Sequence, residues 1–161
     1  MAAVMMKRLA LSVQPLLLAA CAHSPLPAAN VIEIARPIVL VSDTVGNDIA
    51  AYAIFTNRGA ETSIVSASCD CADNVELHVV DRSASSPGMI SSFPLVLPAG
   101  QAVAIEPPGI PRHMMLIGIR QKISEGDVVT MRFLLADGRV VEEAFTAVPS
   151  SAAAWKAFDA K

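Results

Sequence analysis

The chain has 161 residues, of which 53% are hydrophobic and 17% are charged, a composition that fits one folded domain and excludes a disordered tail. The formal net charge of −3 argues against a nucleic-acid-binding surface, which requires a basic excess. Three cysteines are too few for a scaffold held together by disulfides, and the sequence contains neither a Walker loop nor an HExxH motif.

The N-terminal segment predicts export from the cytoplasm. Lys7 and Arg8 precede an apolar run over residues 9–20, which at 12 residues is too short to span a bilayer as a helix. The run ends in the sequence LAAC, which closes with Cys21 and resembles a bacterial lipoprotein cleavage site. The segment is therefore interpreted as a signal peptide and not as a transmembrane helix.

On this interpretation residues 1–20 are removed and Cys21 becomes the lipidated first residue of the mature protein. Residues 21–30 are rich in proline and alanine and predict a tether. The alternative is ordinary cleavage near Ala29 without a lipid. Both routes predict a protein that works outside the cytoplasm, and the lipoprotein route predicts a periplasmic protein attached to the membrane by its lipid only.

The rest of the chain alternates short β-forming runs with turn sequences. Eight or so strands at this spacing predict an all-β domain over residues 31–148, an antiparallel sandwich or barrel, followed by a tail over 149–161. Asp137-Gly138 separates two of the runs and is a strong hairpin signal, whereas residues 151–160 lean helical. The predicted runs are 31–34, 38–41, 49–55, 62–66, 75–80, 89–97 (interrupted by Pro94), 102–105, 113–119, 128–135 and 140–148.

Four potential metal ligands lie on these runs or at their edges: His78, Met89, His113 and Met115. Alternation along a strand places His78 on the face of Glu76, away from the core side, and gives His113 and Met115 a common face. Residues two apart on a strand stand about 6.5 Å from each other, so both side chains can converge on one ion. Taken singly, a methionine in such a domain is usually core filler.

The spacing of these residues is more specific than any one of them. Ten residues separate His78 from Met89, and 23 residues separate Met89 from the His113-x-Met115 pair. This pattern resembles the periplasmic copper chaperones of the PCu(A)C type, with a second gap two residues longer than theirs. The resemblance covers roughly residues 50–147 and includes Ala51-Tyr52, Thr56-Asn57-Arg58-Gly59, Val75-Glu76-Leu77-His78, Pro98-Ala99-Gly100, His113–Gly118 and Glu125–Val129.

The resemblance implies a cupredoxin-like or immunoglobulin-like antiparallel β-sandwich that carries copper. The implied ligands are His78, Met89, His113 and Met115, since thioether sulfur selects Cu(I) and imidazole suits several metals. Cu(II) binding, with His23 as one candidate ligand, is left open. The family delivers copper to the dinuclear copper site of cytochrome c oxidase subunit II, directly or with a thiol-reducing copper chaperone. The implied protein is a monomer that binds no nucleic acid and is not an enzyme.

Other functions remain open at this stage. A copper storage or detoxification lipoprotein would use the same site without an oxidase partner. A metal-free structural β-sandwich lipoprotein would leave the four soft residues in separate places. A blue-copper electron carrier needs a cysteine thiolate with two histidines, and no cysteine lies near His113 in the sequence.

The sequence Cys69-Asp70-Cys71 is not part of the copper motif. Seven residues lead from Cys71 to His78, about 23 Å in an extended strand, which is too far for both to bind one ion. A disulfide, a second Cu(I) site and an inert pair are the three interpretations.

Overall fold

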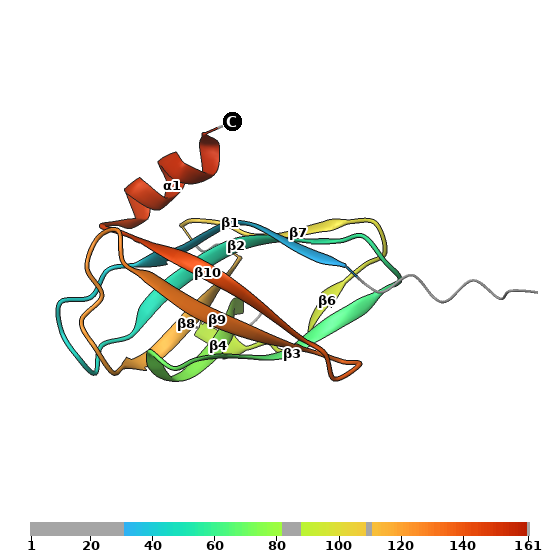
Figure 1. Cartoon of the computed structure of the whole chain (residues 1–161), viewed down its shortest axis with the longest axis horizontal. Helices are drawn as coiled ribbons and strands as arrows, with labels where there is room; N and C mark the ends of the chain where they lie inside the picture. Colours follow the sequence, from blue (N-terminus) through green and yellow to red (C-terminus); the bar gives the residue numbers. More distant parts are fainter. Residues whose placement is uncertain (1–30, 82–87, 109–110, 161) are drawn as a thin grey trace, which may run out of the picture.

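A computed structural model describes residues 31–81, 88–108 and 111–160. The predicted signal peptide, Cys21, His23 and the tether lie outside these residues. In the described part, ten strands precede one short helix (Figure 1). Their bounds are β1 Ile32–Leu40, β2 Ile49–Asn57, β3 Thr62–Cys69, β4 Ala72–Asp81, β5 Gly88–Ser91, β6 Leu95–Leu97, β7 Ala102–Ile105, β8 Arg112–Ile119, β9 Val128–Leu135, β10 Val140–Val148 and α1 Ser151–Asp159.

The strands form one sheet that closes on itself like a barrel. Seven strands follow each other in the order β1, β2, β8, β4, β3, β9 and β10, and β10 pairs in parallel with β1 to complete the ring. The other pairings in the ring are antiparallel. Outside the ring, β5 extends β4, β6 extends β3, and β7 pairs with β2. Ring closure leaves few unpaired strand edges.

The all-β prediction is confirmed, and β7, β9 and β10 have the predicted bounds. The predicted runs 31–34 and 38–41 form one strand, because a bulge at Arg36 (φ +53°) carries the chain past Pro37 without ending β1. The predicted run 89–97 is two strands, since proline cannot donate to a ladder and β5 ends before Pro94.

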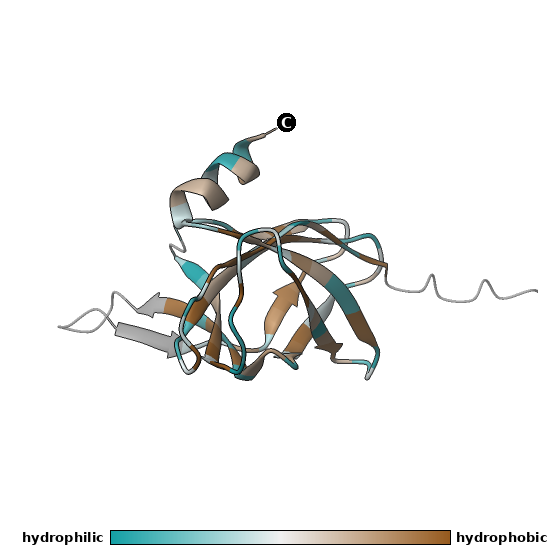
Figure 2. Cartoon of the chain, turned by 60° about the vertical axis from the view of Figure 1, so that its left-hand side comes forward, coloured by the Kyte–Doolittle hydropathy of each residue, from teal (hydrophilic) through white to brown (hydrophobic). Residues whose placement is uncertain are grey.

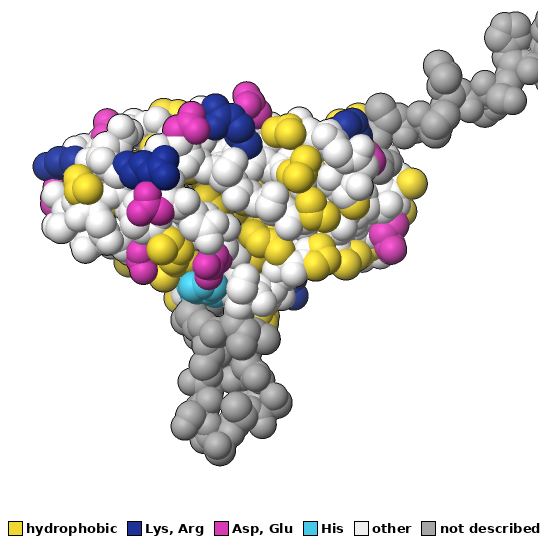
Figure 3. Space-filling view, turned by 90° about the horizontal axis from the view of Figure 1, so that it is seen from below, with side chains coloured by type: hydrophobic (Ala, Val, Ile, Leu, Met, Phe, Trp, Pro, Cys, Tyr) yellow, Lys and Arg dark blue, Asp and Glu magenta, His cyan; other side chains and the backbone are white. Residues whose placement is uncertain are grey.

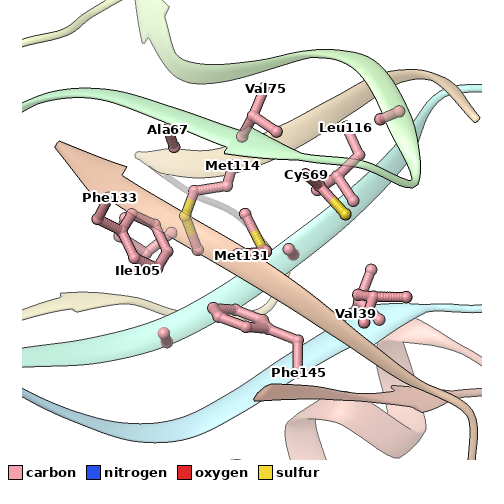
Figure 4. Close-up of a cluster of buried hydrophobic side chains, with 14 of the residues drawn as sticks. Val39, Ala67, Cys69, Val75, Ile105, Met114, Leu116, Met131, Phe133 and Phe145 are labelled. Atoms are coloured by element: carbon pink, nitrogen blue, oxygen red, sulfur yellow. The ribbon is translucent and has the colours of Figure 1, made fainter. Parts of the chain in front are cut away.

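The core lies inside the ring, where alternate residues of β2, β9 and β10 pack together with buried residues of the other ring strands (Figure 2). Phe133 packs edge-on against Phe55, with ring centroids 5.1 Å apart, and at a tilt against Phe145 at 6.0 Å. Met114 and Met131 fill the space beside these rings (Figure 4). These two thioethers are core residues, as expected for an isolated methionine in a β domain.

Helix α1 packs against the outside of the ring, over β1 and β2 (Figure 1). Its first turn is capped by Ser150, whose side chain accepts a hydrogen bond from the Ala153 amide. Phe158 contacts the ring of Tyr52 edge-on at 6.5 Å. Burial raises the pKa of the Tyr52 hydroxyl, although a hydrogen bond with Ser151 opposes the shift. The helix therefore covers apolar surface that β1 and β2 leave outside the barrel.

The turn after β2 is held by a fully buried asparagine. The Asn57 amide nitrogen donates to the carbonyl oxygens of Ala60 at 2.7 Å and Leu97 at 2.8 Å, and its carbonyl accepts from the Gly59 amide. The bond to Leu97 is buried, and the bonds to Ala60 and Gly59 are partly buried. The Thr-Asn-Arg-Gly segment is thus a structural motif that joins β2 to the β6 side of the sheet.

Candidate metal centre

Two histidines lie opposite each other on neighbouring strands. The antiparallel register of β4 and β8 pairs His78 with His113, and the centroids of their rings are 5.5 Å apart at an interplanar angle of 78°. The adjacent pair, Leu77 and Met114, points into the core with 1% exposure each. Alternation along both strands therefore places the two imidazoles together on the outer face of the barrel.

Met115 lies on the same face of β8, two residues from His113. It is partly exposed and stands opposite Glu76 of β4. Met89 occupies β5, where its backbone pairs with Val80, two residues from His78 along β4. Its side chain is outside the described part of the chain. The register thus brings the four predicted ligand positions onto three adjacent strands, although the two histidines are 35 positions apart in sequence.

A carboxylate contacts one of the two imidazoles. Glu76 Oε2 lies 2.7 Å from Nε2 of His78, and Asn74 donates to the other carboxylate oxygen at 3.1 Å. Within the described residues, Nδ1 of His78 is buried and has no hydrogen-bond partner. Buried polar atoms are nearly always partnered, so this nitrogen fits a site whose missing partner is an ion. Figure 3 shows histidine and acidic side chains beside each other on the lower face.

The surrounding donors restrict which ion fits. No group of three or more His, Cys, Asp or Glu residues able to hold a metal occurs in the described part of the chain. Two imidazoles alone do not complete a tetrahedral site of the zinc type. A metal held by His78 and His113 needs further ligands, and Met115, whose thioether favours soft cations, lies on the same face of β8 as His113.

The sequence predicts Glu76 on the same face of the strand as His78 but assigns it no role, and Asn74 is not among the predicted site residues. The three residues alternate along β4 at positions 74, 76 and 78, so each is next to the following one on a single face. The Asn-x-Glu-x-His spacing was the signal that could have identified the group.

The glycine that follows the His-x-Met pair has a structural role. Gly118 has φ +63°, and its amide donates to Asp48. A Cβ atom at this position would lie 2.5 Å from Oδ2 of Asp73, so a larger residue would require Asp73 to move.

The cysteine pair lies away from the histidines, at the turn between β3 and β4. Cys69 and Cys71 form a disulfide, and both are buried, at 7% and 6% exposure. Between them, Asp70 accepts a hydrogen bond from Arg132, and the guanidinium lowers the pKa of this carboxyl. A disulfide offers no thiolate, so in this oxidation state the pair provides no second Cu(I) site.

Comparison with solved structures identifies the fold as that of PCuAC domains. The apo PCuAC domain from PmoF1 matches with a TM-score of 0.60 at 13% identity, covering 74% of this chain and 94% of that domain. The copper-bound PCuAC domain from PmoF2 matches with 0.60 at 14% identity, covering 74% and 93%. CuI-DR1885 from Deinococcus radiodurans matches with 0.55 at 24% identity, covering 74% and 80%.

The chain itself belongs to the LpqE-like family. The model of this family, whose description names a lipoprotein, matches residues 32–147. A search of curated proteins finds no match. The expected PCu(A)C resemblance is therefore confirmed for the fold. None of the helices in the described residues is long and apolar enough to cross a membrane.

Proposed function

We propose that the protein is a Cu(I) chaperone that holds its cargo with His78, Met89, His113 and Met115. The observation that carries the proposal is the β4–β8 register, which sets His78 against His113 and leaves Met115 beside them on the same face. Two neutral imidazoles and two thioethers give a Cu(I) site with a charge of about +1. Such a site contains no thiolate, which in an oxidising compartment would tend to form a disulfide.

The structural neighbours support copper as the cargo. A domain described as copper-bound and another described as a Cu(I) form share this fold. The metal-free interpretation expects the soft residues in separate places, whereas His78, His113 and Met115 lie on one face of two paired strands. We also propose that this barrel-like sheet corresponds to a cupredoxin-like or immunoglobulin-like β-sandwich.

We place this chaperone outside the cytoplasm, in the periplasm. Lipidation of Cys21 would attach it to the membrane, and residues 21–30 would act as the tether between lipid and barrel. The lipoprotein in the family description supports this arrangement. The proposed recipient of copper is the dinuclear site of cytochrome c oxidase subunit II, reached directly or through a thiol-reducing copper chaperone, with the protein acting as a monomer.

The site is tested by anaerobic Cu(I) titration against a chromophoric chelator. We expect one tight equivalent in the wild-type protein and its loss in His113→Ala and Met89→Ala. Met131→Leu is a matched control because Met131 is a fully buried core methionine, and the double change of Cys69 and Cys71 to serine tests the cysteine pair. Both controls should retain the equivalent. Failure of the wild-type protein to compete with the chelator would contradict a copper role.

Delivery requires a separate assay. The Cu(I)-loaded protein is mixed anaerobically with the copper-free soluble domain of subunit II, with and without a dithiol reductant. The two proteins are then separated, and the copper bound to each is quantified. Transfer in either condition supports delivery to the oxidase. Retention of copper in both conditions would support storage or detoxification instead.

A further inference from the structure

The two ring nitrogens of His78, one of the proposed copper ligands, differ in their partners. His78 Nε2 lies 2.7 Å from Glu76 Oε2, and the side chains of these residues are only 17% and 34% exposed. The other ring nitrogen, Nδ1, is buried and lacks a hydrogen-bond partner among the described residues. The two nitrogens of one imidazole therefore have sharply different surroundings.

The contact with Glu76 favours one of the two neutral tautomers of His78. A carboxylate oxygen accepts hydrogen bonds, so a hydrogen bond between His78 and Glu76 Oε2 uses a proton on Nε2. A neutral imidazole has one N–H group, and its lone pair is then on Nδ1. In this tautomer the unpartnered atom is a Lewis base, which is the form that binds a metal ion.

The carboxylate is itself held in place. Asn74 donates to Glu76 Oε1 at 3.1 Å and leaves Oε2 to His78. Because the three residues alternate along β4, the backbone of one strand aligns amide, carboxylate and imidazole in a row. The end of this row is the ring that faces His113 at 5.5 Å.

We propose that Glu76 is a positioning residue that holds the Nε2 proton of His78 and makes Nδ1 the nitrogen that binds copper. The inference rests on the proposed function, because it concerns the same site. Carboxylates that accept a hydrogen bond from a metal-binding histidine fix its orientation and raise its basicity, and losing such a partner typically weakens metal binding about 10–100-fold. Glu76 would act in this way without touching the ion.

The tautomer is measured directly by long-range ¹H–¹⁵N correlation NMR of the purified protein, at a pH where imidazole is neutral. In the copper-free protein we expect a protonated Nε2 and an unprotonated Nδ1 in His78. On addition of Cu(I), the Nδ1 resonance should move while the hydrogen-bonded Nε2 proton stays visible. A protonated Nδ1 in the free protein, or a copper-induced shift confined to Nε2, would overturn the inference.

The role of the carboxylate is tested with Glu76→Ala. We expect loss of the protected Nε2 proton signal and Cu(I) binding weakened about 10–100-fold. Glu33→Ala is the matched control, since Glu33 is also a strand glutamate in an ion pair, with Arg58, and both partners are exposed. Wild-type Cu(I) affinity in Glu76→Ala would overturn the role of Glu76.

The wild-type measurement keeps the proposal testable even if Glu76→Ala does not fold. It also separates this inference from the proposed function. Absence of Cu(I) binding by the wild-type protein would overturn both, whereas tight binding through Nε2 would leave the copper function standing and remove only the role given to Glu76.

Discussion

Two consecutive methionines on β8 test whether strand alternation places one side chain in the core and the next at the proposed copper site. Met114 is 1% exposed and lies inside the barrel, whereas Met115 is partly exposed on the face of His113. The residues are identical in chemistry and adjacent in sequence, so any difference between their variants comes from the strand's alternation. We expect substitution of Met114 to change mainly the free energy of unfolding, and substitution of Met115 to change mainly the Cu(I) affinity.

The loss of stability expected in Met114→Ala follows from the burial of the Met114 side chain. Truncating a buried methionine to alanine typically costs about 2–5 kcal/mol in the free energy of unfolding. With about 120 described residues and an unfolding entropy of about 2.1 cal/mol/K per residue, this corresponds to a fall in Tm of about 8–20 °C. Met115→Ala should change Tm by much less, because its side chain is not enclosed by the core.

The loss of Cu(I) affinity expected in Met115 variants follows from the proposed role of Met115 as a ligand. Losing a residue that only supports a ligand weakens metal binding about 10–100-fold, so losing a ligand should weaken it at least about 10-fold. Leucine variants isolate the sulfur, since exchange of methionine for leucine nearly conserves volume and usually costs less than about 1.5 kcal/mol. Met115→Leu should therefore lose Cu(I) affinity with a nearly unchanged Tm, and Met114→Leu should retain both.

The assays are thermal unfolding of the metal-free proteins and Cu(I) titration with a competing chelator. The reasoning would be refuted if Met114→Leu lost copper while Met115→Leu retained it. That result would mean that the register of β8 is displaced by one residue, which would move every side chain of the strand to the opposite face.

Three further predictions concern stability. Asn57→Ala should lower the free energy of unfolding by at least about 2 kcal/mol without changing Cu(I) stoichiometry, because it removes the three hydrogen bonds of a fully buried side chain. A loss below about 0.5 kcal/mol in urea unfolding would contradict this. Changing Cys69 and Cys71 to alanine should cost about 1.6 kcal/mol from the lost three-residue loop closure, measured by the same method, and an unchanged urea midpoint would argue against that entropic origin. Because the hydrogen bond and charge of Arg132 lower the pKa of Asp70, the carboxylate stabilises the fold above its ordinary pKa of about 3.9, and this contribution is lost as the pH falls through the lowered value. Asp70→Asn should therefore be less stable than wild type at neutral pH and approach it in acid; a difference that persists in acid would point to a cause other than the charge.

Much of the local structure could be predicted from the sequence. Alternation along the predicted strand 113–119 places Met114 and Leu116 on one face and His113 and Met115 on the other. In the structure, Met114 and Leu116 are buried in the core. The Asp137-Gly138 pair predicted the β9–β10 hairpin, in which Gly138 adopts φ +83°. These features depend on neighbouring residues only.

What the sequence by itself determined was therefore the class of fold, most strand positions and the side of the strand on which His78, His113 and Met115 lie. Only the tertiary structure decided that His78 meets His113, that β1 closes the ring against β10 in parallel, and that the buried Nδ1 of His78 has no partner among the described residues. The physical reason is that alternation repeats every two residues and is visible within one strand. Pairing between strands, in contrast, depends on how the whole set of apolar faces closes around one core.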